Sequence, residues 1–546
     1  PGVVVVIVGS RSTAIVPLSM LVSIFNDVIG PVMRGPSSSH CAAALRIGRL
    51  GRDLMGGEIA EVLVEFDVHG SLPTTHDTQG SDMGLFGGLL GWEADDDRLP
   101  DSMRIIQEGG VKVRIETVDV RDEHPNTYRL TLKNARGSHF LKAISTGGGM
   151  MEVVEIDGVP VSLHGDAHVV LAWSDLSSSA LADALAPVIA DTIRCQAVGS
   201  GSLAILADLR PMAEAPLAAM LAKGQLRALR RLSPVLPVLS SRSSHVPFST
   251  CAELLAVHAK APAPLWKHAV AYEAARGGLT EAEVVAKMVA LVCILRRSIA
   301  QGLAGTHYED RVLGFQSGGF ARELAAGRLL DAGSLNRGIL YVTAMMEVKS
   351  SMGVIIAMPT AGACAALPGI VIALAEDRKQ SDEDVARALL AAGLIGVFIA
   401  TAWTFAAEVG GCQAEGGSAA AMAGAALVTL SGGDTPQACA AASMAMQSMI
   451  GLICDPIANR VEAPCLGKNV MAAANALSCA NMALSGFDQV IPFDEVIATA
   501  KRVSAQMPRE LRCTALGGLS ITPTSLAIEQ RLLAKRGCGT GSCGCG

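Results

Sequence analysis

Three long stretches in the second half of the chain contain no charged residue, and they limit what the chain can fold into. They are residues 350–375, 388–407 and 435–454. Each is long enough to span a bilayer, but all are rich in Ala, Gly and Ser and have no girdle of Trp and Tyr. Helices that are apolar on every side also occur at the centre of a large all-α domain. The sequence therefore predicts buried core helices, and the alternative is a membrane protein.

Patterns of hydrophobicity divide the 546 residues into five expected parts. Residues 1–165 alternate strand-like runs with short helical stretches, which predicts an α/β domain of the α+β kind. Residues 166–232 follow the pattern β-α-β-β-α, which is typical of a small regulatory module. Residues 233–248 contain three Pro and five Ser and indicate a linker. Long helical patterns over 249–530 predict an all-α domain, and 531–546 form a low-complexity tail.

The net charge and the cysteine content limit the kinds of partner that we expect and the cellular compartment. The chain has 44 Lys and Arg against 51 Asp and Glu, a net charge of −7, with no long basic block. We therefore expect no nucleic-acid surface. Fourteen cysteines are too few for a disulfide scaffold of this length, so we expect reduced thiols in a cytoplasmic protein. The first residues, PGVVVVIVG, lack the basic region of an intact signal peptide.

The stretch RGPSSSHCAAALRIGRL, residues 34–50, places three hydroxyls and a histidine just before an apolar-periodic run. A helix that begins there presents Ser37, Ser38, Ser39 and His40 at its first turn. Free N–H groups and the positive end of the helix dipole attract a carboxylate at that position. The alternative is an ordinary serine cap with a histidine on the surface.

Three cysteines of the helical half are candidate metal ligands. Cys412 lies in AAEVGGCQAEGGSAAAMAG, Cys454 in GLICDPIANRVEAPC, and Cys465 closes that second stretch. Three thiolates can hold an iron-sulfur cluster and leave one iron open, whereas a structural zinc site is normally closed by four ligands. The spacings of 42 and 11 residues are not a local motif, so buried inert cysteines are the alternative.

These stretches together resemble the iron-sulfur L-serine dehydratases, also called L-serine ammonia-lyases. The resemblance runs through SIFNDVIGPVMRGPSSSH, GSLPTTHDTQGSDMGLFGGLLGW and HPNT, and resumes at FSTCAELL, PTAGACAALPG, the three cysteine contexts and ALGGLSITPT. It covers roughly residues 20–530. The order resembles the two-subunit bacterial form fused β-then-α in one chain. The β part of that form carries an ACT-like module, which matches the β-α-β-β-α pattern.

The resemblance implies a [4Fe-4S] cluster held by Cys412, Cys454 and Cys465, with an open iron that acts as a Lewis acid on the substrate. It implies that L-serine is converted to pyruvate and ammonia, without pyridoxal phosphate. We expect a homodimer that has no nucleic-acid or membrane partner. The alternatives are a related lyase on L-cysteine or L-threonine, and a catalytically impaired homologue that binds an amino acid.

The resemblance also implies a set of residues that contact the substrate or the cluster. They come from the GPSSSH stretch, from HPNT and from the PTAG loop of the helical half. The set is Ser37, Ser38, Ser39, His40, His124, Asn126, Thr360 and Gly362. Glu408 and Glu415 flank Cys412 in apolar surroundings, and we expect them to support the ligands through hydrogen bonds.

One departure from the family concerns the catalytic base. The family usually has GHGTD where this chain has TQGSD, so Gln79 stands in place of a histidine that is the leading candidate for the base. An amide can bind substrate but cannot take a proton. This leaves His76 and His124 as the expected bases, and we prefer His124 because HPNT already belongs to the family's site. The tail cysteines that could cap the open iron are Cys538, Cys543 and Cys545.

Overall fold

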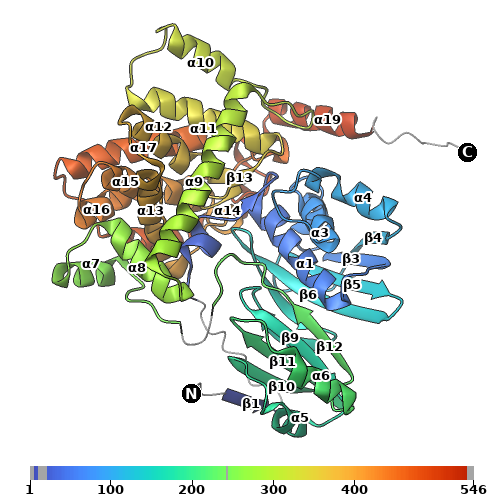
Figure 1. The fold of residues 1–546 in the computed structure, drawn as a ribbon. Coiled ribbons are helices and arrows are strands. Elements are labelled where there is room, and N and C mark those ends of the chain that lie inside the picture. The colour runs from blue at the N-terminus through green and yellow to red at the C-terminus, as the bar shows by residue number, and fades with distance from the viewer. Residues whose placement is uncertain (1–4, 10–20, 241–243, 538–546) are drawn as a thin grey trace, which may run out of the picture. The chain divides into compact units, whose positions relative to one another are not determined.

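Two compact units make up the part of the chain that the computed structural model describes (Figure 1). The described residues are 5–9, 21–240 and 244–537. The sheet unit consists of Pro1–Leu21 and Ser39–His245, and the helical unit consists of Val22–Ser38 and Val246–Gly546. The predicted multidomain chain, with an N-terminal α/β part and a helical C-terminal part, is confirmed. The tail cysteines Cys538, Cys543 and Cys545 lie outside the described residues.

The described residues of the sheet unit form two sheets and six α-helices. Its elements are β1 (Val5–Gly9), α1 (Ala43–Met55), β3 (Glu61–Asp67), α2 (Leu72–Thr75), α3 (Ser81–Leu90), α4 (Ser102–Glu108), β4 (Lys112–Val118), β5 (Thr127–Asn134), β6 (Gly137–Gly147), β7 (Met150–Ile156), β8 (Val159–Leu163), β9 (His168–Ser174), α5 (Ser178–Leu185), β10 (Thr192–Val198), β11 (Gly201–Asp208), α6 (Glu214–Ala222) and β12 (Ala228–Leu232).

The first sheet has six strands in the order β4-β3-β5-β6-β7-β8. Its strands pair antiparallel, except that β3 and β4 are parallel. In β3 the side chains of Val62, Val64 and Phe66 are buried, while those between them are only partly covered. Because successive side chains point to opposite faces of a strand, this alternation buries one face of the sheet in the core.

Helices α1 and α3 pack into the same core and lie against each other. The contact is close because α3 carries glycine where it meets α1: a Cβ on Gly88 would lie 2.1 Å from the Leu45 carbonyl oxygen. Glycine alone permits this approach of two backbones. The contact holds α1, which begins just after His40, against α3, which begins just after Gln79.

The second sheet has the order β1-β10-β11-β9-β12. Along the chain its main elements follow as β9, α5, β10, β11, α6 and β12, which is the expected β-α-β-β-α pattern with one further strand. One face packs against α5 and α6. The other face contributes Trp173 and Leu203 to the core of the six-stranded sheet. The two sheets of this unit therefore share one hydrophobic core.

The helical unit is built almost wholly from helices. Its elements are β2 (Val32–Met33), α7 (Cys251–Lys260), α8 (Leu265–Gly277), α9 (Glu281–Ala304), α10 (Ser317–Ala325), α11 (Ser334–Ser350), β13 (Ile355–Ile356), α12 (Ala366–Asp377), α13 (Asp382–Ala402), α14 (Ala407–Gly410), α15 (Ser418–Leu430), α16 (Thr435–Gln447), α17 (Cys465–Leu484), α18 (Phe493–Gln506) and α19 (Pro523–Gly537).

Helix α15 lies at the centre of this unit, in contact with α12, α13, α16 and α17. The three charge-free stretches supply α12, most of α13 and α16. Small Ala and Gly side chains let these helices pack closely, and their apolar surfaces face one another. Among the described residues, α13 is the one helix long and apolar enough to cross a membrane, and 78% of its most apolar window is buried inside the protein. Burial inside the helical bundle explains why α13 is so apolar.

The segment Val22–Ser38 lies between the two parts of the sheet unit in the sequence but packs with the helices. Strand β2 pairs antiparallel with β13, which places Met33 opposite Ile355. The Ser23 hydroxyl donates to the Glu273 carboxylate of α8 at 2.5 Å. The first residues of the GPSSSH stretch therefore belong to the helical unit.

Candidate active site

The three candidate cysteines lie in the helical unit, two beside the start of a helix and one in an extended segment. Cys412, Cys454 and Cys465 are 4%, 3% and 5% exposed. Cys412 follows Gly411, whose φ of +69° favours glycine, and precedes the turn into α15. Cys454 lies in an extended segment, and Cys465 is the first residue of α17, after Pro464. Buried helix ends and loops therefore supply all three thiols.

The structure brings these cysteines together. The thiols of Cys412 and Cys454 hydrogen-bond, and both residues pack with Ala407. Cys465 interacts electrostatically with Cys412. The hydrogen bond with Cys412, together with burial, raises the pKa of Cys454, and burial raises the pKa of Cys465. Because thiols lose their protons when they bind a metal, metal binding at these cysteines releases protons.

Two lysines place positive charge beside the cysteines. Lys468 Nζ lies 3.6 Å from Cys412 Sγ and donates to the Asp455 carboxylate at 2.7 Å. Burial opposes the charge on Lys468, but the negative charges of Cys412 and Asp455 outweigh it and raise the pKa of the ammonium. Lys349 is completely buried and interacts electrostatically with Cys465. Both ammonium groups favour the thiolate form of the cysteines.

The spacing of the sulfurs distinguishes two kinds of metal site. A single tetrahedral zinc ion needs sulfurs about 3.8 Å apart. Among the described residues, one group of three His, Cys, Asp or Glu has all its ligand atoms within 4.8 Å of one another, and it is Asp67, His69 and Asp119 of the sheet unit. The three cysteine sulfurs therefore do not all lie within 4.8 Å of one another. A donor set of three thiols fits an iron-sulfur cluster in its chemistry.

The PTAG loop, residues 359–362, packs against a carboxyl group from the turn after Cys412. Thr360 Oγ1 accepts a hydrogen bond from the Ala363 N–H at 3.2 Å, and its hydroxyl bonds the Glu415 side chain. A Cβ on Gly362 would lie 2.7 Å from Glu415 Oε2. Glycine at this position therefore lets the loop approach the carboxyl group.

Asn469, which no sequence motif singled out, joins this loop to the helix of Cys465. Its Nδ2 donates to the Gly362 carbonyl at 2.8 Å and to the Cys465 carbonyl at 2.9 Å. Its Oδ1 accepts from the Ala366 N–H at 3.1 Å. Asn469 lies four residues after Cys465 on α17, so both are on one helix face. That spacing is the sequence signal that could have identified it.

Glu408 and Glu415 are only partly exposed, and both carboxyl groups are desolvated. Desolvation, reinforced by the charge of Glu408, raises the pKa of Glu415 to about 7. Desolvation also raises the pKa of Glu408. Near neutral pH the Glu415 carboxyl therefore exists in both protonation states, and it can accept or donate a hydrogen bond at the PTAG loop.

The boundary between the two units falls within the GPSSSH stretch, between Ser38 and Ser39. In the helical unit, the Ala361 N–H of the PTAG loop donates to Ser38 Oγ at 3.5 Å. In the sheet unit, the Ser39 carbonyl accepts from the Ser145 hydroxyl at 2.6 Å. Ser37 is half-buried. Ser38 is therefore the serine that the structure places at the PTAG loop.

His40 is buried in the sheet unit beside α2. Its Nε2 lies 3.0 Å from Thr75 Oγ1, and the Thr75 hydroxyl donates to the Ser71 carbonyl at 2.8 Å. Because the Thr75 hydroxyl donates its proton to the Ser71 carbonyl, Thr75 Oγ1 accepts the hydrogen bond from His40. The ring proton of His40 is therefore on Nε2. Burial lowers the pKa of His40 to about 4, so the ring is neutral at pH 7.

His124 and Asn126 lie at the other side of the same short helix. The Ser71 hydroxyl donates to Asn126 Oδ1, and the Asn126 N–H donates to His124 Nδ1 at 3.1 Å. Burial lowers the pKa of His124. The structure therefore gathers three predicted site residues of the sheet unit, His40, His124 and Asn126, around α2.

His76 directly follows α2 and faces an acidic partner. Its Nδ1 lies 2.8 Å from both carboxylate oxygens of Asp82. Desolvation opposes a positive charge on the ring, but the bond to Asp82 and its charge outweigh this and raise the pKa of His76. Gln79 is 4% exposed, and its backbone N–H donates to the Thr75 carbonyl at 2.9 Å. No periodicity in the sequence marks the pairing of His76 with Asp82.

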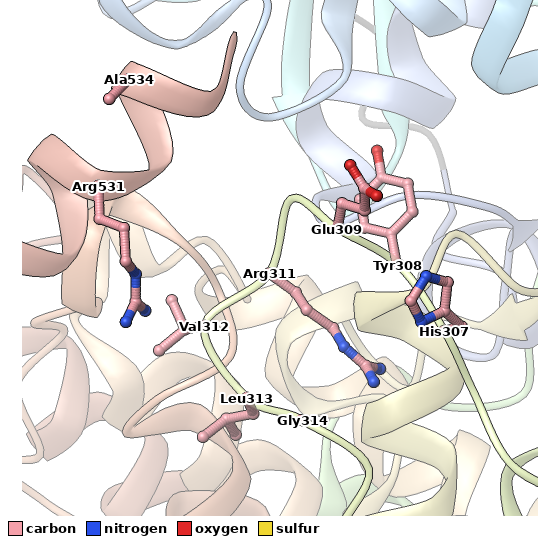
Figure 2. Close-up of a pocket in the computed structure, with 9 residues that line it drawn as sticks. All are labelled: His307, Tyr308, Glu309, Arg311, Val312, Leu313, Gly314, Arg531 and Ala534. Carbon is pink, nitrogen blue, oxygen red and sulfur yellow. The ribbon is translucent and has the colours of Figure 1, made fainter. Parts of the chain in front are cut away.

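An open cavity of about 950 Å³ lies elsewhere in the helical unit (Figure 2). None of its described lining residues belongs to the predicted site. The Val312 and Leu313 N–H groups in its wall donate to Glu462 at 3.0 and 2.9 Å. They tie the cavity wall to the segment between Cys454 and Cys465. The lining residues are His307, Tyr308, Glu309, Arg311, Val312, Leu313, Gly314, Arg531 and Ala534.

In comparisons with known proteins, both halves of the chain are similar in sequence to one group of enzymes. A sequence model of the family described as "Serine dehydratase alpha chain" matches residues 258–520. The chain is 34% identical over 253 residues to a probable L-serine dehydratase alpha chain of Bacillus subtilis, which covers 46% of this chain and 84% of the relative.

Two further relatives extend the similarity. The L-serine dehydratase alpha chain of Peptoniphilus asaccharolyticus is 36% identical over 258 residues, or 46% of this chain and 87% of the relative. A probable L-serine dehydratase beta chain of Bacillus subtilis is 39% identical over 145 residues, or 27% of this chain and 65% of the relative. Sequences similar to an alpha chain and to a beta chain are therefore joined in one polypeptide.

Proposed function

Because the chain belongs to the serine dehydratase family and joins a beta-like part to an alpha-like part, we propose that it is an L-serine dehydratase. Such an L-serine ammonia-lyase removes water from L-serine to give aminoacrylate, which becomes pyruvate and ammonia. The observation that carries this proposal is the convergence of Cys412, Cys454 and Cys465 inside the region matched by the alpha-chain family. Lyase activity on L-cysteine or L-threonine, or an impaired homologue, is less favoured because the relatives are named for L-serine.

The three thiolates would hold a [4Fe-4S] cluster, and pyridoxal phosphate would take no part. When bound, the cluster would supply a Lewis acid that helps hydroxide to leave. The donor set supports this assignment, since such clusters are held by thiolates. Lys468 and Lys349 would offset the negative charge that three thiolates bring into a buried site.

We propose that the substrate carboxylate and hydroxyl meet uncharged donors around the PTAG loop. Ser38 and Thr360 contribute hydroxyl groups there, and Gly362 leaves room for the loop to approach Glu415. Ser37, Ser39 and His40 complete the proposed substrate set from the same GPSSSH stretch.

The hydrogen-bond pattern favours His76 over His124 as the base that takes the Cα proton. His124 Nδ1 already accepts the Asn126 N–H, so the proton of its neutral ring lies on Nε2 and no lone pair remains. His76 donates through Nδ1 to Asp82, which leaves the Nε2 lone pair to accept a proton. Gln79 would hydrogen-bond the substrate.

We further propose that residues 166–232 form an ACT-like module that binds an amino acid as a regulator. The β-α-β-β-α-β order supports this assignment, since β9, β10, β11 and β12 pair antiparallel and both helices lie on one face of the sheet. A homodimer and a cytoplasmic location belong to the same proposal. Native mass measurement with and without L-serine tests the assembly.

The decisive experiment is anaerobic purification, followed by iron and sulfide analysis and a keto-acid assay. We expect iron and sulfide in equal amounts and pyruvate from L-serine, with less product from L-threonine or L-cysteine. The matched pair of variants is Cys465→Ser and Cys479→Ser, since both cysteines lie on α17 and Cys479 only bonds Asn475. The first should lose iron and activity, and the second should keep both. Pyruvate formation by the iron-free protein would reject the proposal.

A further inference from the structure

A thiol outside the proposed ligand set lies beside one of its members. The Cys513 N–H donates to the Cys454 carbonyl at 3.1 Å, and the Cys454 N–H donates to the Leu511 carbonyl at 2.9 Å. The two segments therefore run parallel at this point. Cys454 is opposite Arg512 in this bridge, so the backbone of the next residue, Cys513, is bonded directly to that of Cys454.

The side chains of the same two residues are also in contact. Their thiols hydrogen-bond, and Cys513 packs against the group formed by Ala407, Cys412 and Cys454. Cys513 has a φ of +59°, a conformation that non-glycine residues seldom adopt. The backbone bonds to Cys454 hold it there. The two thiols are therefore in contact in the folded chain.

The two thiols differ in exposure. Cys454 is 3% exposed, whereas Cys513 is half-buried. Cys513 is the more exposed residue of the pair, and the sulfur of Cys454 lies beside its own. Once Cys513 is oxidised, the neighbouring thiol of Cys454 can react with it to form a disulfide.

We propose that Cys454 and Cys513 form a disulfide when Cys454 holds no iron and a two-electron thiol oxidant is present. Two S–H bonds break and one S–S bond forms. The two protons and two electrons pass to the oxidant, for example to the N=N bond of an azodicarboxamide, which becomes a hydrazine. A dithiol reductant reverses the step and is itself oxidised to a disulfide.

The disulfide would keep Cys454 from binding iron until it is reduced. This consequence rests on the proposed function, because it requires Cys454 to be a cluster ligand. The pairing of the two sulfurs does not depend on that function. Cys513 is thus a redox modification site. Its oxidation determines whether the chain that has lost iron can bind iron again.

A second thiol pair provides an internal comparison. Cys251 and Cys439 also hydrogen-bond, but they are 3% and 1% exposed. Neither residue is as exposed as Cys513. We therefore expect this pair to stay reduced in the folded chain under conditions that link Cys454 to Cys513.

The test uses the full chain, purified without oxygen. One sample keeps its iron, and a chelator removes the iron from the other. Azodicarboxamide is added to the reduced, desalted protein, and the remaining thiols are alkylated. Trypsin cuts after Arg512, so Cys513 begins its own peptide. A second protease that cuts before aspartate separates Cys454 from Cys412. Cys439 stays in the same peptide as Cys454, so fragment ions recorded without reduction identify the linked residues.

We expect a Cys454–Cys513 link in the iron-free chain, and no such link in the iron-loaded chain or in Cys513→Ser. Cys479→Ser should form the link as the unsubstituted chain does. After oxidation, Cys513→Ser should take up iron and sulfide without a reductant, whereas the unsubstituted chain should require one.

The peptide map also separates failure of this inference from failure of the proposed function. A link between Cys454 and Cys412, or alkylation of both Cys454 and Cys513, would overturn the inference even if the chain binds a cluster. A Cys454–Cys513 link in a chain that never takes up iron would uphold the pairing and reject the cluster.

Discussion

At the scale of single residues, the site depends on side chains that satisfy several backbone groups at once. The amide of Asn469 serves two carbonyl oxygens and two N–H groups, and so fixes the PTAG loop to the first turn of α17. Leaving buried backbone groups unpaired costs about 1–3 kcal/mol. The position of the loop beside Cys465 is therefore held by one side chain.

Asn469→Ala should lower the rate of pyruvate formation at least about tenfold, because small misplacements of reacting groups are costly. It should also lower the free energy of unfolding by about 1–3 kcal/mol. Asn475→Ala is the control, since Asn475 lies on the same helix and bonds the Ala445 carbonyl outside the site. Enzyme assays and urea unfolding of both variants compare them. Equal activities would show that Asn469 has only a structural role.

The pairing of His76 with Asp82 predicts a pH dependence. A base acts in its neutral form, so the rate should rise with pH through the pKa of His76, which Asp82 raises. Asp82→Asn removes the negative charge and lowers that pKa. The acid limb of kcat/KM against pH should then move to lower pH. His124→Asn should leave the limb in place, and the opposite pattern would make His124 the base.

At the scale of elements, close packing depends on glycine where two helices meet. A Cβ on Gly88 would lie 2.1 Å from the backbone of α1, whereas one on Gly319 of the exposed α10 would meet only the end of Arg322 at 3.9 Å. Overpacking of this kind costs about 1–3 kcal/mol. The same substitution should thus destabilise the chain at Gly88 but not at Gly319.

Gly88→Ala should therefore destabilise the chain by about 1–3 kcal/mol in urea unfolding. Gly319→Ala should be neutral or stabilise it by up to about 1 kcal/mol, because alanine favours the helix. If Gly88→Ala unfolds at the same urea concentration as the unsubstituted chain, the contact between α1 and α3 is not tight in solution.

Strand β12 shows why one element escaped the sequence pattern. Its sequence ALRRL has no alternation of apolar and polar residues, and only Leu232 is buried. The strand is instead held by pairing with β9, and Arg230 donates to the Leu54 carbonyl at 2.8 Å. Long-range contacts, not local periodicity, thus complete the second sheet.

At the scale of the whole molecule, all three proposed ligands lie in the helical unit. A group that binds only the folded state stabilises that state. Removing iron with a chelator should therefore lower the melting temperature of the helical unit. Hydrogen exchange should increase around Cys412, Cys454 and Cys465 and stay unchanged in β3 and β5 of the sheet unit.

The proposal that these three cysteines bind iron also predicts how iron retention depends on pH. Burial raises the pKa of Cys465, so protons compete more strongly with iron as the pH falls. Iron loss to a chelator should therefore be faster at lower pH. A loss rate independent of pH, or increased exchange throughout the sheet unit, would contradict the assignment of these cysteines.

Local patterns were enough to determine several features of this protein. The charge-free stretches predicted core helices because an uncharged run of that length must be buried, and α12, α13 and α16 follow from it. The strand-like runs of residues 1–165 predicted strands, and β3 is one of them. The motif resemblance indicated the serine dehydratase family, to which the chain belongs.

Only the tertiary structure decided which distant residues meet. It joined Val22–Ser38 to the helices, paired His76 with Asp82, and set Asn469 between the PTAG loop and Cys465. It also placed Cys513 beside Cys454, although the two lie in separate segments of the chain. Periodicity records only what happens within a few turns or strand residues. The packing of whole helices against one another sets these longer contacts, and no single stretch of sequence contains that information.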